Sequence, residues 1–579
     1  MMLLSLCMMV FMITAGYLIL HVDERLDSEE RLACSLTAST LILGVSSIPF
    51  YGRGLENIVF MPLMFAALAV ALMFRGRVGF SVDKRLVLLF VLSLVIKLGL
   101  TYMQTGPTTT DSIFHFLASQ SLQTGNWFTK PFVDNYWAGD TIPSPLTYRP
   151  PLYHIILAAT YTLSGVSFQA GQWISSLFGA AIVLPTYLLG KRLFNDRVAY
   201  WSAILMALNP YFMHRSLDTE PRTMVAYLTL VTFYFMLKGR EYWPYYSISA
   251  GLAYLTHFSS MFYLISFMGI YAYTNRKALV DRRTALAAMV FILIISPWFV
   301  RNQLVFGSPF YSSSKYLPLL YKTESFNTLE PPTLNSYIGQ WGGGPVGVAK
   351  VLGVRALNVI TGYFPPPHKA LDYGLVWMLS GLVPSNVSWL VFIAGLMGLV
   401  EVARRGLHPF VVVIVFVSLT GPLTLGYPTS RSVSVSTLHA LTPLYTLLGV
   451  MWVEKRKDKK MLMSLLVASV VLNDIILFSA RGSHGPDAEV MGWLRENTSQ
   501  DERIMSLDAL WITYHTGREG YITPYEPREI IEDAIAEHEI DYLVIGPGDL
   551  KLRDIDKGWV EENYMLAHQN GDYSVYRTK

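Results

Sequence analysis

The sequence predicts a mainly α-helical membrane protein: a polytopic bundle of about fourteen transmembrane helices, followed by a small C-terminal α/β domain. Of its 579 residues, 52% are hydrophobic and only 15% are charged, whereas soluble proteins carry about 25% charged residues. Apolar stretches of the length that crosses a bilayer recur throughout residues 1–480. Residues 483–579 instead mix charged and apolar positions, as a water-exposed domain does.

The predicted spans form an N-terminal group within residues 1–104 and a longer group within residues 105–482. They are residues 2–21, 32–50, 55–74, 85–104, 168–190, 196–214, 221–237, 242–257, 259–275, 283–301, 374–402, 408–426, 432–452 and 461–480. The first stretch lacks a basic leading region and a small-residue cleavage site, so we expect a retained span rather than a signal peptide. Cys7 and Cys34 both lie in apolar stretches, which predicts neither a disulfide framework nor a cysteine metal site.

Basic residues in the short loops predict the orientation of the bundle. Lysine and arginine concentrate in alternate short loops, which are therefore predicted to be cytoplasmic. The long segments 105–167 and 302–373 then lie outside the cell membrane, and so does the C-terminal domain. Within the first of these segments, residues 150–165 begin with Pro-Pro and follow many aromatic residues. We expect them to lie on or dip into the outer leaflet rather than to span.

The second external segment and the C-terminal domain have simpler predictions. Residues 302–373 are rich in proline and glycine and are predicted to cover a site, because long loops in compact proteins are usually functional or disordered. In the C-terminal domain the pattern predicts a helix at 527–538, a strand at 541–546 and a hairpin turn at Asn570-Gly571. This domain holds no complete catalytic set, so a rigid cap or an acceptor-side surface is favoured.

Acidic residues in two successive external loops are the candidate catalytic groups. Asp111 follows three threonines and begins an amphipathic stretch, so it is either a helix N-cap or a general base, and the two roles are compatible. A carboxylate at a partly dry interface is expected to have raised basicity. Asp218 and Glu220 can orient an acceptor, hold a divalent cation or cap the next span. Any metal site would use Asp111 and Asp218, and no other cofactor is expected.

Basic residues predicted near the same membrane face are the candidate substrate-binding groups. They are Arg149, His154, His257, Arg301 and Arg431. Interfacial arginine is often only a snorkelling anchor. Several guanidinium groups that converge on one cavity would, however, match the oxygens of a phosphate.

Motifs in a fixed order between residues 105 and 450 carry a family resemblance. They are Asp111 with Gly125-Asn126-Trp127 and Arg149-Pro150-Pro151-Leu152-Tyr153, the stretch 179–218 with Gly190-Lys191-Arg192-Leu193-Phe194, Pro297-Trp298-Phe299-Val300-Arg301-Asn302, and Phe306-Gly307-Ser308-Pro309. In this order they resemble the GT-C superfamily of membrane glycosyltransferases. The resemblance is strongest to the glycosyltransferase family 39-like group of protein O-mannosyltransferases and aminoarabinose transferases.

The resemblance implies roles for individual residues. Asp111 would be the catalytic carboxylate of the first external loop, and Asp218 the second-loop acid that helps to bind a metal in the oligosaccharyltransferase branch. Arg431 is placed like an arginine that contacts the lipid phosphate in that branch, and Arg149 like the basic residue before Pro-Pro in the aminoarabinose group. The sequence departs from the mannosyltransferases at Ser112, where they carry a second acid. It also lacks the Trp-Trp-Asp motif of oligosaccharyltransferases.

The implied activity is an inverting transfer of a hexose or pentose from a polyprenyl-phosphate donor, such as a dolichyl phosphate, to a protein, glycan or lipid acceptor at the outer membrane face. Asp111 would be the general base, and Asp218 and Glu220 would position the acceptor or a cation. Nucleotide-sugar use is disfavoured, because the chain has no glycine-rich phosphate loop. Membrane lipids are expected partners and nucleic acid is not.

The alternative is a transporter or flippase of lipid-linked saccharides that performs no covalent chemistry. Transporters are often built from inverted repeats and place ionisable groups near the membrane midplane. The sequence shows no such repeat, and its candidate groups lie mostly at one predicted face.

Overall fold

The structure is a computed structural model of the chain. It describes residues 2–21, 23–47, 82–104, 106–274, 281–313, 327–331, 333–363, 388–404, 440–479, 488–553 and 555–579, together with Ile414 and Val417. The predicted span 55–74, all but two residues of the predicted span 408–426, and Arg431 lie outside the described residues.

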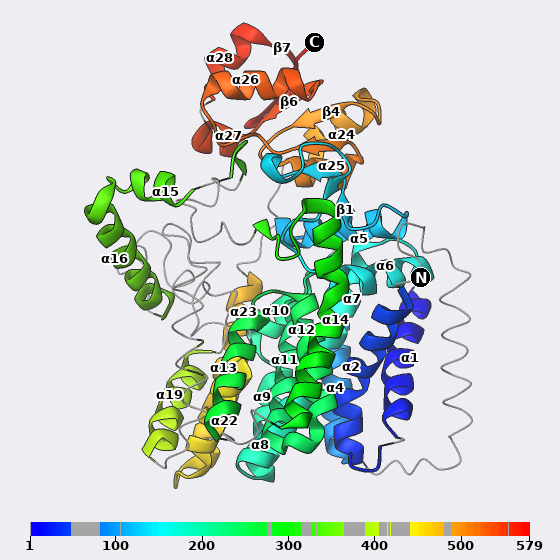
Figure 1. The fold of residues 1–579 in the computed structure, drawn as a ribbon, viewed down its shortest axis with the longest axis vertical. Coiled ribbons are helices and arrows are strands. Elements are labelled where there is room, and N and C mark those ends of the chain that lie inside the picture. The colour runs from blue at the N-terminus through cyan, green and yellow to red at the C-terminus, as the bar shows by residue number, and fades with distance from the viewer. Residues whose placement is uncertain are drawn as a thin grey trace.

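A bundle of helices forms the body of the molecule, and a smaller α/β layer lies at one end of it (Figure 1). The bundle helices are α1 (Met2–Leu20), α2 (Ser28–Ser47), α4 (Lys84–Thr101), α7 (Phe168–Ala181), α8 (Val183–Leu193), α9 (Asp196–Ala207), α10 (Pro210–Ser216), α11 (Arg222–Lys238), α12 (Trp243–Thr256), α13 (Ser260–Thr274), α14 (Arg282–Phe306), α19 (Trp389–Arg404), α22 (Leu441–Glu454) and α23 (Lys459–Ser479). The short α15 (Leu334–Gln340) and α16 (Gly344–Tyr363) follow α14. The predicted helical character is confirmed.

Two helical stretches of the described chain are long and apolar enough to cross a membrane by themselves. They are residues Phe168–Leu193, which comprise α7 and α8, and residues Arg282–Phe306, which form α14. The first is buried inside the bundle, whereas most of the second faces outward. The figure of about fourteen spans therefore stays a prediction.

The predicted span 196–214 is interrupted, because α9 ends at Ala207 and α10 begins at Pro210. Proline cannot donate the backbone hydrogen bond that a continuing helix needs, but it is well suited to the first turn of a new one. The side chain of Asn209 caps that turn by accepting from the backbone N–H of Phe212. Arg215 is therefore carried by the separate short helix α10 and not by a continuation of α9.

Two helices of the first long segment lie between the bundle and the α/β layer: α5 (Thr110–Gln123) and α6 (Leu152–Ser164). The cap of α5 is Thr109, whose hydroxyl accepts from the N–H of Ser112, so Asp111 is not the N-cap that its sequence position suggested. Nearly all side chains of α6 are buried. The expected leaflet-surface helix is thus covered by protein, since α6 packs against α5, α7 and α2.

The α/β layer is built on a six-stranded sheet with the order β2-β5-β4-β6-β8-β7. Its strands are β2 (Phe132–Val133), β4 (Arg503–Met505), β5 (Glu519–Tyr521), β6 (Tyr542–Ile545), β7 (Met565–Asn570) and β8 (Tyr573–Arg577). The first four in the order pair in parallel, whereas β8 pairs antiparallel with both β6 and β7. The predicted helix appears as α26 (Arg528–Glu537), and Gly571 makes the predicted hairpin turn with φ of +54°. The edge strand β2 comes from the first long segment, far away in sequence.

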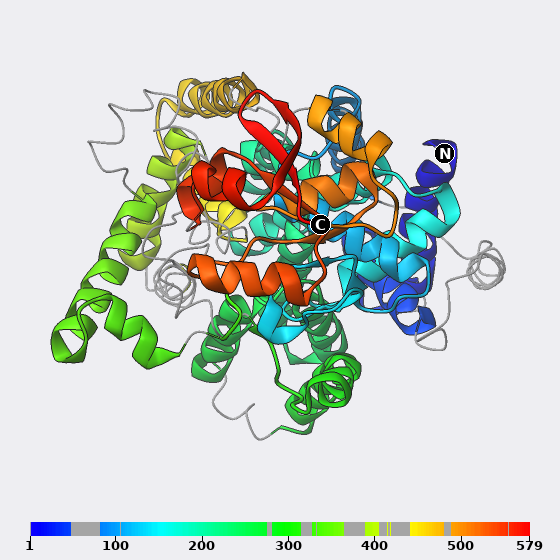
Figure 2. The ribbon, with the colours of Figure 1, turned by 90° about the horizontal axis from the view of Figure 1, so that it is seen from above.

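An aromatic contact attaches the α/β layer to the helix that carries Asp111. Seen from above, the orange and red C-terminal elements overlie the cyan segment that contains α5 (Figure 2). Tyr514 of α25 (Ala509–Thr516) packs edge-on against Phe116 of α5, with ring centroids 5.3 Å apart, and against Phe168 of α7 at 6.2 Å. Offset and edge-on aromatic pairs add stability beyond the area that they bury.

Replacing Tyr514 by alanine should lower the free energy of unfolding by about 2 kcal/mol, because two ring contacts disappear. The apparent Tm of the detergent-solubilised protein should fall accordingly. Thermal unfolding followed by intrinsic fluorescence measures the change. Tyr514→Phe is the matched control and should keep the parental Tm, since it retains both rings. Equal Tm values for the alanine variant and the parent would contradict this role for the contact.

Candidate active site

Asp111 lies in the first turn of α5 and is held by two arginines from different parts of the chain. Arg149, just before α6, forms an ion pair with Oδ1 of Asp111. Arg222, the first residue of α11, approaches Oδ2 at 3.1 Å. The positive end of the α5 helix dipole also favours a negative charge at this position. The carboxylate keeps 29% of its side-chain surface accessible, so it is able to meet a substrate.

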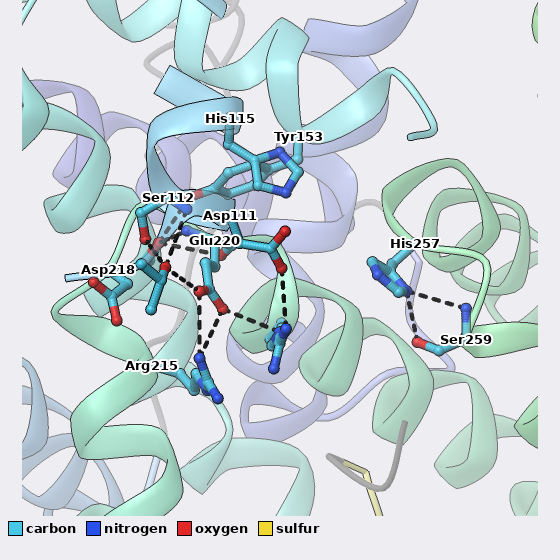
Figure 3. A network of polar contacts seen from close by, with 12 residues as sticks. Asp111, Ser112, His115, Tyr153, Arg215, Asp218, Glu220, His257 and Ser259 are labelled. Atoms are coloured by element: carbon cyan, nitrogen blue, oxygen red, sulfur yellow. Dashed lines mark hydrogen bonds and ion pairs between the residues drawn. The ribbon is translucent and has the colours of Figure 1, made fainter. Parts of the chain in front are cut away.

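Glu220 is the buried counterpart of Asp111. Its side chain is 1% exposed, forms an ion pair with Nε of Arg222 at 3.0 Å and accepts a hydrogen bond from Nη1 of Arg215 at 3.1 Å. The hydroxyl of Thr109 donates to its other oxygen at 3.0 Å. Arg222 therefore bridges both carboxylates, and Thr109 joins the cap of α5 to the same acid. Figure 3 shows Asp111, Glu220 and Arg215 converging at this point.

The electrostatic surroundings of Asp111 correct one expectation. Burial by itself would raise the pKa of Asp111, but the charges of Arg149 and Arg222, with a contribution from His257, outweigh burial and hold that pKa well below its ordinary value. The expectation of raised basicity is therefore wrong for the unliganded arrangement. The sequence did not show that two cations would meet the Asp111 carboxylate.

Two stacked imidazoles lie beside this ion-paired group. Nδ1 of His115 and Nε2 of His154 are 2.9 Å apart, and the ring centroids are separated by 4.9 Å. Arg149 reaches Nε2 of His115 at 3.4 Å. Burial, followed by the charge of Arg149, lowers the pKa of His154 to about 3 and also lowers that of His115. Both rings are therefore neutral near pH 7, and His154 acts on the site through His115 rather than by direct contact with the acids.

Two other predicted residues occupy separate positions. His257 lies in the turn between α12 and α13, where its Nδ1 is 2.8 Å from the hydroxyl of Ser259, to one side of the acids (Figure 3). Arg301 of α14 donates to the carbonyl oxygens of Leu146 at 2.8 Å and Phe128 at 3.2 Å. Its guanidinium thus fixes the backbone of the loop that carries Arg149.

Asp218 lies next to Glu220 and is almost fully buried. The hydroxyl of Thr108 donates to its Oδ1 at 2.9 Å. In the part of the chain that the structure describes, no group of three or more His, Cys, Asp or Glu side chains is placed to hold a metal ion. The bond from Thr108 ties the second acidic loop to the residues just before α5, as Thr109 does through Glu220.

Three residues of the site were missed by the sequence analysis: Arg215, Arg222 and His115. The two arginines flank Asp218-Thr219-Glu220 on both sides, and this symmetry was a usable signal, because buried acids need local cationic partners. His115 lies one helical turn after Asp111 and so faces the same side of α5.

Replacing Glu220 by glutamine should lower the unfolding free energy by about 2 kcal/mol or more, because Arg215 and Arg222 lose a buried counter-charge. Glu241→Gln is the matched control. Glu241 is 52% exposed and pairs with Arg283 at the surface, so its loss should cost less than about 1 kcal/mol. Thermal and denaturant unfolding of both variants measure the difference, and equal losses would rule out a structural role for the buried bridge.

Comparison with known protein families matches part of the chain. Residues 148–300 match the family described as dolichyl-phosphate-mannose-protein mannosyltransferase. The matched segment contains Arg149, the second acidic loop and Arg222, and it begins after Asp111. No curated protein matches the sequence.

Comparison with solved structures extends the likeness to most of the chain. The archaeal oligosaccharyltransferase AglB from Archaeoglobus fulgidus, in complex with an inhibitory peptide and a dolichol-phosphate, aligns with a TM-score of 0.51 and 14% identity, over 86% of this chain and 74% of that chain. The apo form of the A. fulgidus oligosaccharyltransferase gives 0.53 and 14%, over 83% and 73%. ArnT from Cupriavidus metallidurans bound to undecaprenyl phosphate gives 0.44 and 14%, over 85% and 98%.

At this level of identity the A. fulgidus structures establish a shared fold, while the matched segment adds a sequence signature inside that fold. Both findings agree with the resemblance that the ordered motifs carry. The family match within residues 148–300 and the shared fold together support the resemblance to the GT-C superfamily of membrane glycosyltransferases.

Proposed function

We propose that the protein transfers a sugar from a polyprenyl-phosphate donor to a hydroxyl group of a protein, glycan or lipid acceptor at the outer membrane face, with inversion at the anomeric carbon. Residues 105–482 would form its catalytic part. The proposal is supported by the mannosyltransferase signature in residues 148–300 and by a fold shared with an oligosaccharyltransferase whose structure contains dolichol-phosphate. The basic residues of the opposite short loops support the outer-face placement.

The observation that carries the proposal is the ion-paired group of Asp111, Glu220, Arg149, Arg215 and Arg222, which we term the acid–arginine cluster. Three guanidinium groups oppose two carboxylates, so the cluster has one positive charge in excess. A sugar linked to a lipid through a phosphodiester carries one negative charge. The cluster therefore has the charge that such a donor neutralises, and arginine offers the fork geometry that phosphate oxygens accept.

The cluster also suggests how Asp111 becomes a base. When the donor phosphate binds Arg149 and Arg222, it competes with Asp111 for their N–H groups. Arg222 stays anchored by Glu220, while the carboxylate of Asp111 loses the partners that lower its pKa. Its basicity then rises at the moment when the donor is in place, so that proton abstraction is coupled to donor binding.

The reaction is then a single displacement. Asp111 accepts the proton of the acceptor hydroxyl, and the hydroxyl oxygen forms a bond to the anomeric carbon of the sugar. The bond between that carbon and the phosphate oxygen breaks, and its electron pair leaves with the phosphate. The arginines stabilise the charge that develops there, as fixed cations do in transition states. Asp218 and Glu220 keep the second loop in position to orient the acceptor.

A transporter or flippase is the competing function. Figure 1 places α5 and α6 at one end of the bundle, beneath the α/β layer, and the acid–arginine cluster is built around the start of α5. Transporters usually bind substrate near the midplane, so this position favours surface chemistry. Radiolabelled sugar that crosses vesicles without a new glycosidic bond would favour the transporter instead.

Asp111→Asn should reduce sugar transfer by a factor of about 10² to 10⁴, the usual contribution of a general base. The assay incubates the solubilised full chain with polyprenyl-phosphate hexoses and pentoses and detects products by mass spectrometry. Asp140→Asn, which changes an exposed acid of the same segment, is the control and should keep the parental rate. A folded Asp111→Asn protein that transfers sugar at the parental rate would contradict the assignment of Asp111 as the general base.

Replacing Arg149 by glutamine should move the acidic limb of the kcat/KM profile to higher pH. A base works only when deprotonated, so activity falls as the pH drops through its pKa. With both arginines the pKa of Asp111 lies well below its ordinary value, and removal of one cation raises it. Arg149→Lys keeps the charge and should leave the limb at low pH. A uniform rate loss at every pH in Arg149→Gln would argue against this electrostatic role.

A further inference from the structure

Two adjoining cavities lie at the end of the bundle opposite to α5 and α6. The first has a volume of about 760 Å³ and is lined by residues 193–198, which join α8 to α9, and by the ends of α19 and α22. The second, of about 1120 Å³, runs along α9 and α23. The two cavities adjoin, because Arg197, Glu454 and Lys459 line both of them, and we term the pair the groove. Figure 1 places α8, α19 and α22 at this lower end.

The groove changes from charged to apolar along its length. Its second part is bounded by Trp201 and Ile204 on α9 and by a face of α23 that carries Ala468, Val471 and Ile475. The α23 residues follow the three- and four-residue spacing of one helical face. Ile475 is 58% exposed, so protein leaves much of this apolar face uncovered.

The charged end of the groove has a positive excess. Four basic residues and two acids line it, which gives a net charge of +2; they are Arg197, Lys455, Lys459, Lys460, Asp196 and Glu454. Lys459 pairs with Glu454 at 3.3 Å, and Lys455 pairs with Glu401 at 2.9 Å.

Two of these cations remain for a ligand. Among the residues that the structure describes, neither Arg197 nor Lys460 forms an ion pair with a carboxylate, and both side chains are exposed at the groove. Asp196 lies in the first turn of α9, where the helix dipole compensates its charge. The cationic end therefore offers two positive groups to an anionic headgroup.

We propose that this groove binds an anionic phospholipid, with its phosphate at Arg197 and Lys460 and an acyl chain along α9 and α23. Basic pockets between membrane helices on the cytoplasmic side bind acidic lipid headgroups, and each lysine or arginine there adds to the affinity. The groove has this chemistry in the required order, with cations at the end of the bundle and an apolar channel toward its middle. The site is separate from the acid–arginine cluster, which lies at the other end.

A bound lipid would also hold α23 in place. This helix adjoins α9 across the groove and leads toward the α/β layer, while its upper part meets α10 through the rings of Phe478 and His214, 4.4 Å apart. An acyl chain between α9 and α23 would supply the apolar contact that the side chains leave open. Lipid binding should therefore stabilise the folded protein, because a ligand that binds only the folded state raises its stability.

The test is native mass spectrometry of the detergent-solubilised full chain, titrated with phosphatidylglycerol and with phosphatidylcholine of identical acyl chains. For the first lipid molecule that binds, we expect the Kd of phosphatidylglycerol to be lower than that of phosphatidylcholine by a factor of at least about ten. Arg197→Gln combined with Lys460→Gln should abolish this preference. Lys84→Gln combined with Lys457→Gln removes the same charge from residues that line neither cavity, and should preserve it.

A second variant tests the apolar part of the groove. Ala468→Trp places a large ring on an exposed position of α23 and should weaken the binding of both lipids without unfolding the protein. Phosphatidylglycerol should raise the Tm of the parent and of the Lys84/Lys457 control, but not that of the Arg197/Lys460 variant. Equal affinity of the parent for the two lipids, equal retention of phosphatidylglycerol by the two double variants, or undiminished binding by Ala468→Trp would overturn the proposal.

Discussion

The bridge that Arg222 makes between Asp111 and Glu220 is the interaction on which the site depends. Glu220 is nearly inaccessible to water, and a buried carboxylate without cations would be strongly unfavourable. One guanidinium at the start of α11 satisfies this acid and at the same time reaches the accessible Asp111. The first and second acidic loops are thereby fixed to each other, and Arg149, further along the same long segment as Asp111, completes the cluster.

The α/β layer reinforces this geometry from above. The sheet takes its edge strand β2 from the segment between α5 and α6, where Val133 pairs with Tyr521 of β5. Tyr514 packs against Phe116 on α5 itself. The helix that carries Asp111 is therefore held between the bundle and the layer, and its position depends on residues that lie far from it in the sequence.

Charge balance links the chemistry of the cluster to its ligand. A carboxylate whose pKa is held low by two arginines is a stable anion and a weak base. Competition from a phosphate for the same arginines would reverse that condition. The groove at the other end of the bundle also has a positive excess, but its cations adjoin an apolar channel. This combination suits the headgroup and acyl chain of a lipid rather than a reacting substrate.

The sequence by itself determined the features that arise from neighbours along the chain: the apolar helices, the hairpin at Gly571, and the presence of Asp111 and Glu220 in successive loops. Tertiary structure alone decided which cations meet Asp111. Arg222 lies 111 residues from Asp111, and no local periodicity records such a pairing. The same holds for Arg301, predicted as a phosphate ligand and found bonded to the Phe128 carbonyl. The low pKa of Asp111 depends on distances between segments, because electrostatic energy falls with separation in space and not along the chain.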